Sequence, residues 1–223
     1  MGKRIAIDGP SGSGKSTIAK ALAKRLGFVH IDTGAMYRAV ALRAQNIGVN
    51  IGSEAAVLGV MENISLDIQF NEGRQIIFLD GEDVTTLLRS LEIGIVASRV
   101  SAFAGVRERL VLMQQNLAKE RDVVMDGRDV GTVVLSDADL KIFLEADVKV
   151  RAERRCAEML ALGHSFDYDE VLSQIIKRDL DDTSREHSPL VKAKDAVVID
   201  ASYLDIDEAV EVIYKIICEK RII

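Results

Sequence analysis

Short, predominantly apolar runs recur along the chain and are separated by longer segments with helical periodicity. The runs are three or four residues long and occupy residues 5–7, 28–31, 123–125, 141–144 and 196–199. Continuous runs of this length are typical of strands that are covered on both faces. Strands that alternate with helices predict a parallel sheet with helices on both sides, and ligands of such sheets gather at the carboxyl ends of the strands.

The segments between the runs carry helix signals. The first repeats an apolar residue every four positions and ends at Gly27, where a left-handed C-cap is needed. Asp32 or Thr33 can cap the second helix, and Ser53 can cap the third. Helices are therefore expected at about 15–26, 33–45, 53–61, 87–119 with a break near 103–105, 148–162, 168–184 and 206–220.

Residues 64–85 follow a different pattern, in which apolar and polar residues alternate. This alternation is typical of antiparallel strands, and the turn residues at 71–73 and 80–81 divide the stretch into hairpin-like pieces. The sequence therefore predicts a small antiparallel β insert, with turns of its own that suggest a semi-independent unit.

A glycine-rich turn follows the first predicted strand. Residues 9–16 read GPSGSGKS, a full match to the pattern G-x-x-x-x-G-K-[ST]. Glycines let the backbone approach a polyphosphate closely, and the N–H groups of the turn form an anion-binding nest at the start of a helix. Lys15 adds a full positive charge, and Ser16 offers a hydroxyl to Mg²⁺. The stretch therefore predicts nucleoside triphosphate binding.

Arginine and aspartate residues follow the other predicted strands. One such arginine is most simply a solvated surface charge, but several at neighbouring strand ends favour a phosphate site, because the guanidinium fork makes paired hydrogen bonds to phosphate. Tyr37 suits core packing as well as a ligand contact. The residues in question are Thr33, Tyr37 and Arg38 after the second strand, Asp126, Arg128 and Asp129 after the third, and Arg178, Asp182 and Arg185 before the fifth.

A second group of arginines, at positions 151, 154 and 155, shares one predicted helix with Glu153 and Glu158. Pairs three or four residues apart on a helix can bind each other, so these arginines suit either a functional role or local ion pairs. The residues alone leave both readings open.

Length and composition restrict the possible class of protein. A chain of 223 residues fits one domain with an elaboration, and its net charge of -6 argues against a general binder of nucleic acid or anionic membranes. Two distant cysteines and three scattered histidines suggest neither a disulfide framework nor a zinc site. Without a recognisable targeting segment or membrane span, we expect a cytoplasmic protein. We also expect a monomer.

Four motifs in the order DGPSGSGKST, DTGAMYR, DGRDVGT and R-D-x-x-D-x-x-R resemble the bacterial cytidylate kinases, which are P-loop nucleoside monophosphate kinases. The phosphate loop alone identifies only a large superfamily, whereas the four motifs together are specific, and the resemblance covers essentially the whole chain. It implies a single α/β domain over residues 1–223, a P-loop three-layer α/β/α fold with a five-stranded parallel sheet. The acceptor-binding region with its β insert would span about 33–104, and a short lid about 151–168.

The resemblance also implies site residues. The ATP site would comprise Gly9, Pro10, Ser11, Gly12, Ser13, Gly14, Lys15, Ser16 and Thr17, with Ser16 as the Mg²⁺ ligand. Arg38 and Arg128 would bind the acceptor phosphate. Arg151 and Arg155 would join Lys15 and Arg128 at the transferring phosphoryl group. Local ion pairs on the same helix remain the alternative role for Arg151 and Arg155. Other CMP contacts would come from Thr33, Arg107, Asp129 and Arg185 for the base, from Ser98, Arg178 and Asp182 for the sugar, and from Tyr37.

The reaction implied is phosphoryl transfer from ATP to CMP or dCMP. Other P-loop kinases of small acceptors such as UMP, AMP or shikimate share the loop, so the base contacts decide among them. A regulatory GTPase would need an N-K-x-D sequence, which this chain lacks, and would leave the strand-end arginines without a role. A non-catalytic interaction protein finds support only in the insert. Within the predicted base contacts, Arg109 is an alternative to Arg107.

Overall fold

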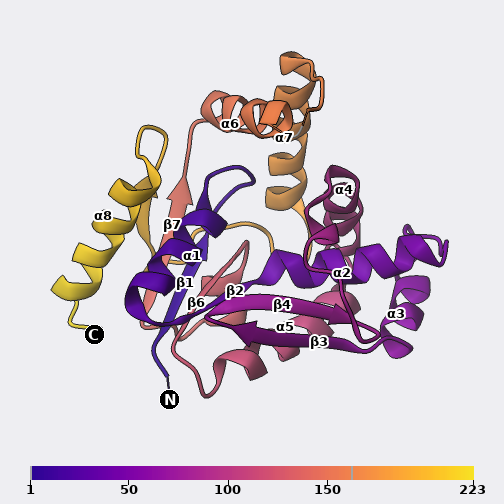
Figure 1. Cartoon of the computed structure of the whole chain (residues 1–223), viewed down its shortest axis with the longest axis horizontal. Helices are drawn as coiled ribbons and strands as arrows, with labels where there is room; N and C mark the ends of the chain where they lie inside the picture. The colour runs from indigo at the N-terminus through magenta and orange to yellow at the C-terminus, as the bar shows by residue number, and fades with distance from the viewer. Residues whose placement is uncertain (1, 162) are drawn as a thin grey trace.

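A five-stranded parallel sheet forms the centre of the computed structural model, which describes residues 2–161 and 163–223 (Figure 1). The strand order is β2-β6-β1-β7-β8, and every neighbouring pair is parallel. The predicted parallel sheet is confirmed. Its strands are β1 (Arg4–Asp8), β2 (Val29–Asp32), β6 (Val123–Gly127), β7 (Leu140–Glu145) and β8 (Val197–Asp200).

Helices cover both faces of this sheet. On one face, Ile5 and Ile7 pack in a cluster with α1 (Lys15–Leu26) and α8 (Ile206–Glu219). On the other face, Ala6 packs with α5 (Ala104–Ala118) and with η2 (Val130–Val134), a short π-helical turn. The central strand is therefore buried on both sides, which is why its sequence is apolar without alternation.

The predicted helix boundaries are largely confirmed. Gly27 ends α1 with φ of 70°, which is the left-handed conformation that glycine adopts most readily. Asp32 caps α2 (Thr33–Asn46), and Ser53 caps α3 (Glu54–Glu62), each by accepting a backbone N–H. The predicted break near residue 103 separates α4 (Leu91–Val100) from α5.

The β insert contains β3 (Leu66–Asn71), β4 (Arg74–Leu79) and the short β5 (Glu82–Asp83), paired antiparallel. A three-residue helical turn, η1 (Leu87–Arg89), leads from it into α4. The insert is not the semi-independent unit that its turns suggest, because its apolar residues Ile68, Ile77 and Leu79 belong to one cluster with α2, α3, α4 and α5. Gln75 also accepts a hydrogen bond from the Asp32 N–H at 2.7 Å.

Two helices, α6 (Val148–Ala161) and α7 (Tyr168–Ser184), project together from the carboxyl end of the sheet (Figure 1). They share a small cluster around Ala152, Cys156 and Val171. This pair contains the predicted lid, a role that stays a prediction, and the expected end of its first helix at Leu162 lies outside the described residues. No helix in the described ranges is long and apolar enough to cross a membrane.

Candidate functional site

The glycine-rich turn between β1 and α1 needs its glycines for steric reasons. Gly12 and Gly14 have φ values of 77° and 90°, which side-chain-bearing residues rarely adopt. A Cβ on Gly9 would lie 2.2 Å from the carbonyl oxygen of Leu144. The hydroxyl of Ser13 is buried beneath the turn and has no hydrogen-bond partner among the described residues. The backbone therefore has the close, donor-rich geometry of a phosphate nest.

Lys15 lies at the base of this turn. Its side chain is largely buried, with the residue only 6% exposed, and Nζ donates to the carbonyl oxygen of Pro10 at 2.9 Å. Burial, followed by the nearby charge of Arg128, lowers the pKa of Lys15 to about 7. A bound polyphosphate would supply the missing negative charge, so the structure favours an anionic ligand at this point.

Asp126 joins the phosphate loop to the sheet. Its Oδ2 accepts a hydrogen bond from Ser16 Oγ at 2.5 Å, and its Oδ1 lies 2.7 Å from His30 Nε2. Burial opposes ionisation of Asp126, but the hydrogen bond and charge of His30 together with the charge of Lys15 hold its pKa below the usual value. An ionised carboxylate only accepts, so Ser16 donates its proton and keeps its lone pairs for another partner.

These oxygen donors suit Mg²⁺, a hard cation that takes oxygen ligands and usually keeps several waters. Ser16 would be the direct ligand, and Asp126 would orient its hydroxyl from behind; both roles stay predictions. No cluster of three or more His, Cys, Asp or Glu side chains that could hold a metal occurs within residues 2–161 and 163–223. An ion at Ser16 would thus depend on phosphate oxygens for much of its coordination.

Asp8, at the end of β1, holds the loop that follows β6. Its carboxylate accepts the backbone N–H groups of Val130 at 2.8 Å and Gly131 at 2.7 Å. These bonds fix the chain immediately after Arg128 and Asp129. Burial raises the pKa of Asp8 to about 6, although the two backbone donors oppose the rise.

The raised pKa makes Asp8 a source of pH-dependent stability. The unfolded chain ionises this group near its ordinary value of 3.8, so ionisation subtracts stability from the fold as pH rises from about 4 through about 6. Asp8→Asn cannot ionise. We expect the free energy of unfolding of Asp8→Asn to gain about 3 kcal/mol relative to wild type between pH 4 and pH 7.

Urea unfolding of both proteins across this pH range measures the gain, and Asp207→Asn, at an exposed position on α8, is the matched control. The absolute stability of Asp8→Asn carries a constant penalty, because an amide oxygen replaces two acceptors for the Val130 and Gly131 N–H groups. A stability difference between the two proteins that does not vary with pH would contradict the raised pKa of Asp8.

The acceptor side of the site is built from buried ion pairs between distant segments. Arg107 on α5 donates to Asp129 after β6, and each residue is only 4% exposed. Arg107 also donates to the carbonyl oxygen of Ser101 at 2.9 Å. The alternative, Arg109, instead pairs with Glu62 at the surface. The structure thus places Arg107, rather than Arg109, beside the other predicted base contacts.

A second group of pairs brings α7 to the same place. Arg128 Nε donates to Asp182 Oδ2 at 2.7 Å, and Arg185 NH1 lies 3.7 Å from the other oxygen of that carboxylate. Burial opposes ionisation of Asp182, but the charge and hydrogen bond of Arg128 keep its pKa below the usual value. The DGRDVGT loop and the C-terminal end of α7 therefore form one charged surface.

Cations in this surface repel one another. Burial, followed by the charge of Arg128, lowers the pKa of Arg178 to about 10, and Arg38 and Arg155 add to the effect. Arg178 Nε is buried without a hydrogen-bond partner within the described part of the chain. Arg38 itself pairs with Asp32 at 2.6 Å. A group of cations with this surplus of positive charge predicts an anionic ligand.

Three further predicted residues lie around this group. Tyr37 is buried, its ring lies 5.3 Å from the guanidinium carbon of Arg107, and its hydroxyl has no hydrogen-bond partner among residues 2–161 and 163–223. Thr33 Oγ1 donates to the carbonyl oxygen of Asp126 at 2.8 Å. Ser98 is half-buried on α4, one turn before Ser101. Their roles toward a nucleotide stay predictions.

The arginines of the predicted lid are held by protein groups. Arg151 is buried and donates to the carbonyl oxygen of Ser11 at 3.1 Å and to Asp179 at 2.6 Å. It thereby links the phosphate loop to both helices of the projecting pair. Arg155 pairs with Glu158 at 2.8 Å, which is one of the local pairs that the helical spacing allows. Contact of either arginine with the transferring group stays a prediction.

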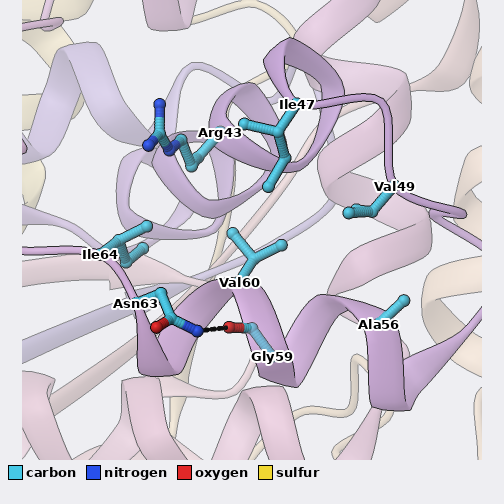
Figure 2. Close-up of a pocket in the computed structure, with 8 residues that line it drawn as sticks. All are labelled: Arg43, Ile47, Val49, Ala56, Gly59, Val60, Asn63 and Ile64. Atoms are coloured by element: carbon cyan, nitrogen blue, oxygen red, sulfur yellow. Dashed lines mark hydrogen bonds between the residues drawn. The ribbon is translucent and has the colours of Figure 1, made fainter.

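The described part of the chain has hollows on its surface, and two of them bear on the location of the candidate site. One of about 440 Å³ lies beside the phosphate loop, where Pro10, Glu145, Asp179 and Ser202 contribute to its walls. Figure 2 shows the other, of about 250 Å³, between α2 and α3, where Ile47, Val60 and other mostly apolar residues surround it. None of the predicted site residues lines this second hollow, so only the first adjoins the candidate site.

A phosphate loop that faces arginines from neighbouring strand ends is the arrangement of a P-loop kinase. Solved structures agree at the level of the fold. A shikimate kinase from Bacteroides thetaiotaomicron superposes with a TM-score of 0.50 and 17% identity, over 96% of this chain and 98% of its own. An uncharacterized protein from Eubacterium ventriosum superposes with a TM-score of 0.55 and 17% identity, over 97% and 98% of the two chains.

Sequence comparison is more specific: the chain belongs to the cytidylate kinase family, which it matches over residues 5–219. The cytidylate kinase of Caldicellulosiruptor saccharolyticus is 49% identical over 96% of each chain. That of Geobacillus sp. is 46% identical over 97% of each chain, and that of Geobacter sulfurreducens is 43% identical over 97% of this chain and 93% of its own. The family predicted from the four motifs is confirmed.

Proposed function

We propose that this protein transfers the γ-phosphoryl group of ATP to CMP or dCMP and releases ADP with CDP or dCDP. The observation that carries the proposal is the half-buried group of cations, including Arg128 and Arg178, whose charges act on Lys15 in the phosphate loop. Transfer between two bound phosphates needs positioning and charge neutralisation rather than a protein nucleophile. The family and its curated relatives support the same reaction.

ATP would bind with its phosphates in the nest formed by residues 9–17. Lys15 would neutralise the transferring group from below, and its buried position means that the charge is oriented before the reaction begins. Ser16 would hold Mg²⁺, which would supply charge neutralisation at the phosphates. Asp126 would keep the Ser16 hydroxyl turned so that its lone pairs face the ion.

CMP would bind between α2, α5 and α7. Arg38 and Arg128 would bind its phosphate in line with the γ-phosphate of ATP. Arg178 and Asp182 would contact the sugar. Asp129 would accept a hydrogen bond from the amino group of cytosine while Arg107 holds the carboxylate in place. This polarity supports cytosine over uracil, which presents a carbonyl oxygen at the same position.

A coupled assay of ADP production tests the proposal with CMP, dCMP, UMP, AMP and shikimate as acceptors. We expect CMP and dCMP to give the highest kcat/KM. Turnover confined to shikimate would overturn it, and so would a clear preference for UMP or AMP. Acceptor-independent hydrolysis of ATP would instead favour a regulatory NTPase.

A further inference from the structure

His30 is a buried histidine for which the proposed reaction has no role. It lies on β2, is 8% exposed and has Val124 on β6 as its register partner. Two residues further along β6, on the same face of the sheet, lies Asp126. The His30 imidazole reaches this neighbour diagonally, with Nε2 2.7 Å from Asp126 Oδ1. Ser16, at the start of α1, approaches the other oxygen at 2.5 Å.

The two contacts together fix the carboxylate of Asp126. Each oxygen receives one donor, Ser16 for one and His30 for the other, so rotation of the carboxylate about its bond would break both hydrogen bonds. Loss of the imidazole would leave Oδ1 buried without its donor, a costly state for a charged oxygen. The carboxylate would then turn or recruit water, and the Ser16 hydroxyl would lose its fixed acceptor.

The orientation of Ser16 matters because its hydroxyl has one proton. While that proton points to Asp126, the lone pairs of Oγ stay available for another partner. A freely rotating hydroxyl would present its proton to a cation for part of the time. Groups that orient a metal ligand from behind commonly change metal affinity when they are removed.

We propose that His30 is a positioning residue that holds Asp126 and, through it, aims the Ser16 hydroxyl at the metal ion of metal-bound ATP. The inference rests on the proposed ATP site but not on the identity of the acceptor. His30 touches neither the nucleotide nor the reacting atoms. It acts over a chain of two hydrogen bonds that joins β2, β6 and α1.

Two substitutions separate the hydrogen bond from the packing. His30→Leu fills much of the same volume without a donor, whereas His30→Gln places an amide N–H at a reach similar to that of Nε2. Lys141→Met is the matched control, because it removes the polar contact of another buried side chain, with the exposed Asp195 at 3.0 Å, on a strand away from Ser16.

Calorimetry of ATP binding, with and without Mg²⁺ and in the absence of any acceptor, gives the readout. We expect His30→Leu to weaken Mg²⁺-dependent ATP binding by roughly tenfold or more while metal-free ATP binding stays within about twofold of wild type. His30→Gln should recover most of the loss, and Lys141→Met should show none. Equal losses with and without Mg²⁺, or equal losses in the Gln and Leu variants, would overturn the proposal.

Nitrogen NMR of the unliganded protein provides a second test, and its decisive measurement is made on the wild type. A ¹⁵N spectrum should show a proton on His30 Nε2, and Asp126→Asn should shift that signal strongly while Lys141→Met leaves it in place. An unprotonated Nε2 in the wild type would refute the donor role. Because neither measurement uses CMP, a failure of the acceptor assignment would leave both results interpretable.

Discussion

Lys15→Ala is expected to lower turnover by roughly two or more orders of magnitude without unfolding the protein. In the proposed reaction the ammonium would be a preorganised charge beneath the transferring group, and loss of such a charge removes stabilisation that develops in the transition state. The unliganded fold gains little from this charge. Burial and Arg128 lower the pKa of Lys15 to about 7, so its removal relieves strain between cations. We expect the variant to be at least as stable as wild type without nucleotide.

Steady-state kinetics at saturating Mg-ATP and CMP, paired with urea unfolding, checks both parts of this prediction. Lys20→Ala is the control, because Lys20 is an exposed lysine on the same helix. It should keep wild-type turnover. Near-normal turnover of folded Lys15→Ala would remove the lysine from the mechanism.

The sheet and the helix boundaries could be predicted because their signals are local. A strand covered on both faces must be apolar throughout, and a helix end needs a cap within a residue or two of its boundary, as Gly27 and Ser53 supply. The dependence of the insert on the main core is not local. Alternation along β3 and β4 reports which face is buried, but it says nothing about which helices bury that face.

The candidate site likewise has one part with a local sequence signal and another that depends on packing. The phosphate loop is contiguous, so its residues identify it directly. The ion pairs of the predicted acceptor side join residues far apart in the chain. They depend on the strand register and on the π-helical turn after β6, which no sequence pattern indicated. Arg107 and Arg109 point to different sides of α5, and only the packing of that helix shows which one reaches Asp129. The contact of His30 with Asp126 was missed because it depends on a diagonal between two strands.

Asp129→Asn is expected to reduce the preference for CMP over UMP. Cytosine presents an amino donor where uracil presents a carbonyl oxygen. An ionised carboxylate can only accept, so it binds the first and repels the second. Asparagine removes the charge and can turn its NH₂ group toward the uracil carbonyl. The ratio of kcat/KM for CMP over UMP should fall. Expressed as a free energy, the loss of discrimination should be about 1 to 3 kcal/mol, the usual scale for one good base contact.

The ratio is the correct measure because this substitution also affects the fold. Asp129 is the buried partner of Arg107, and removal of one member of a buried ion pair typically costs about 3 to 5 kcal/mol of stability. A smaller folded fraction lowers both rates equally and cancels in the ratio. Glu62→Gln is the matched control, since it removes a carboxylate from the surface pair with Arg109, outside the site.

The control should leave the CMP to UMP ratio unchanged, and dCMP should respond to Asp129→Asn as CMP does, because the two share a base. If the ratio holds constant in Asp129→Asn while both rates fall, the carboxylate serves only to neutralise Arg107. Base choice would then have to reside in Thr33, Arg107 or Arg185. The same substitution that lowers stability therefore separates a structural aspartate from one that reads the base.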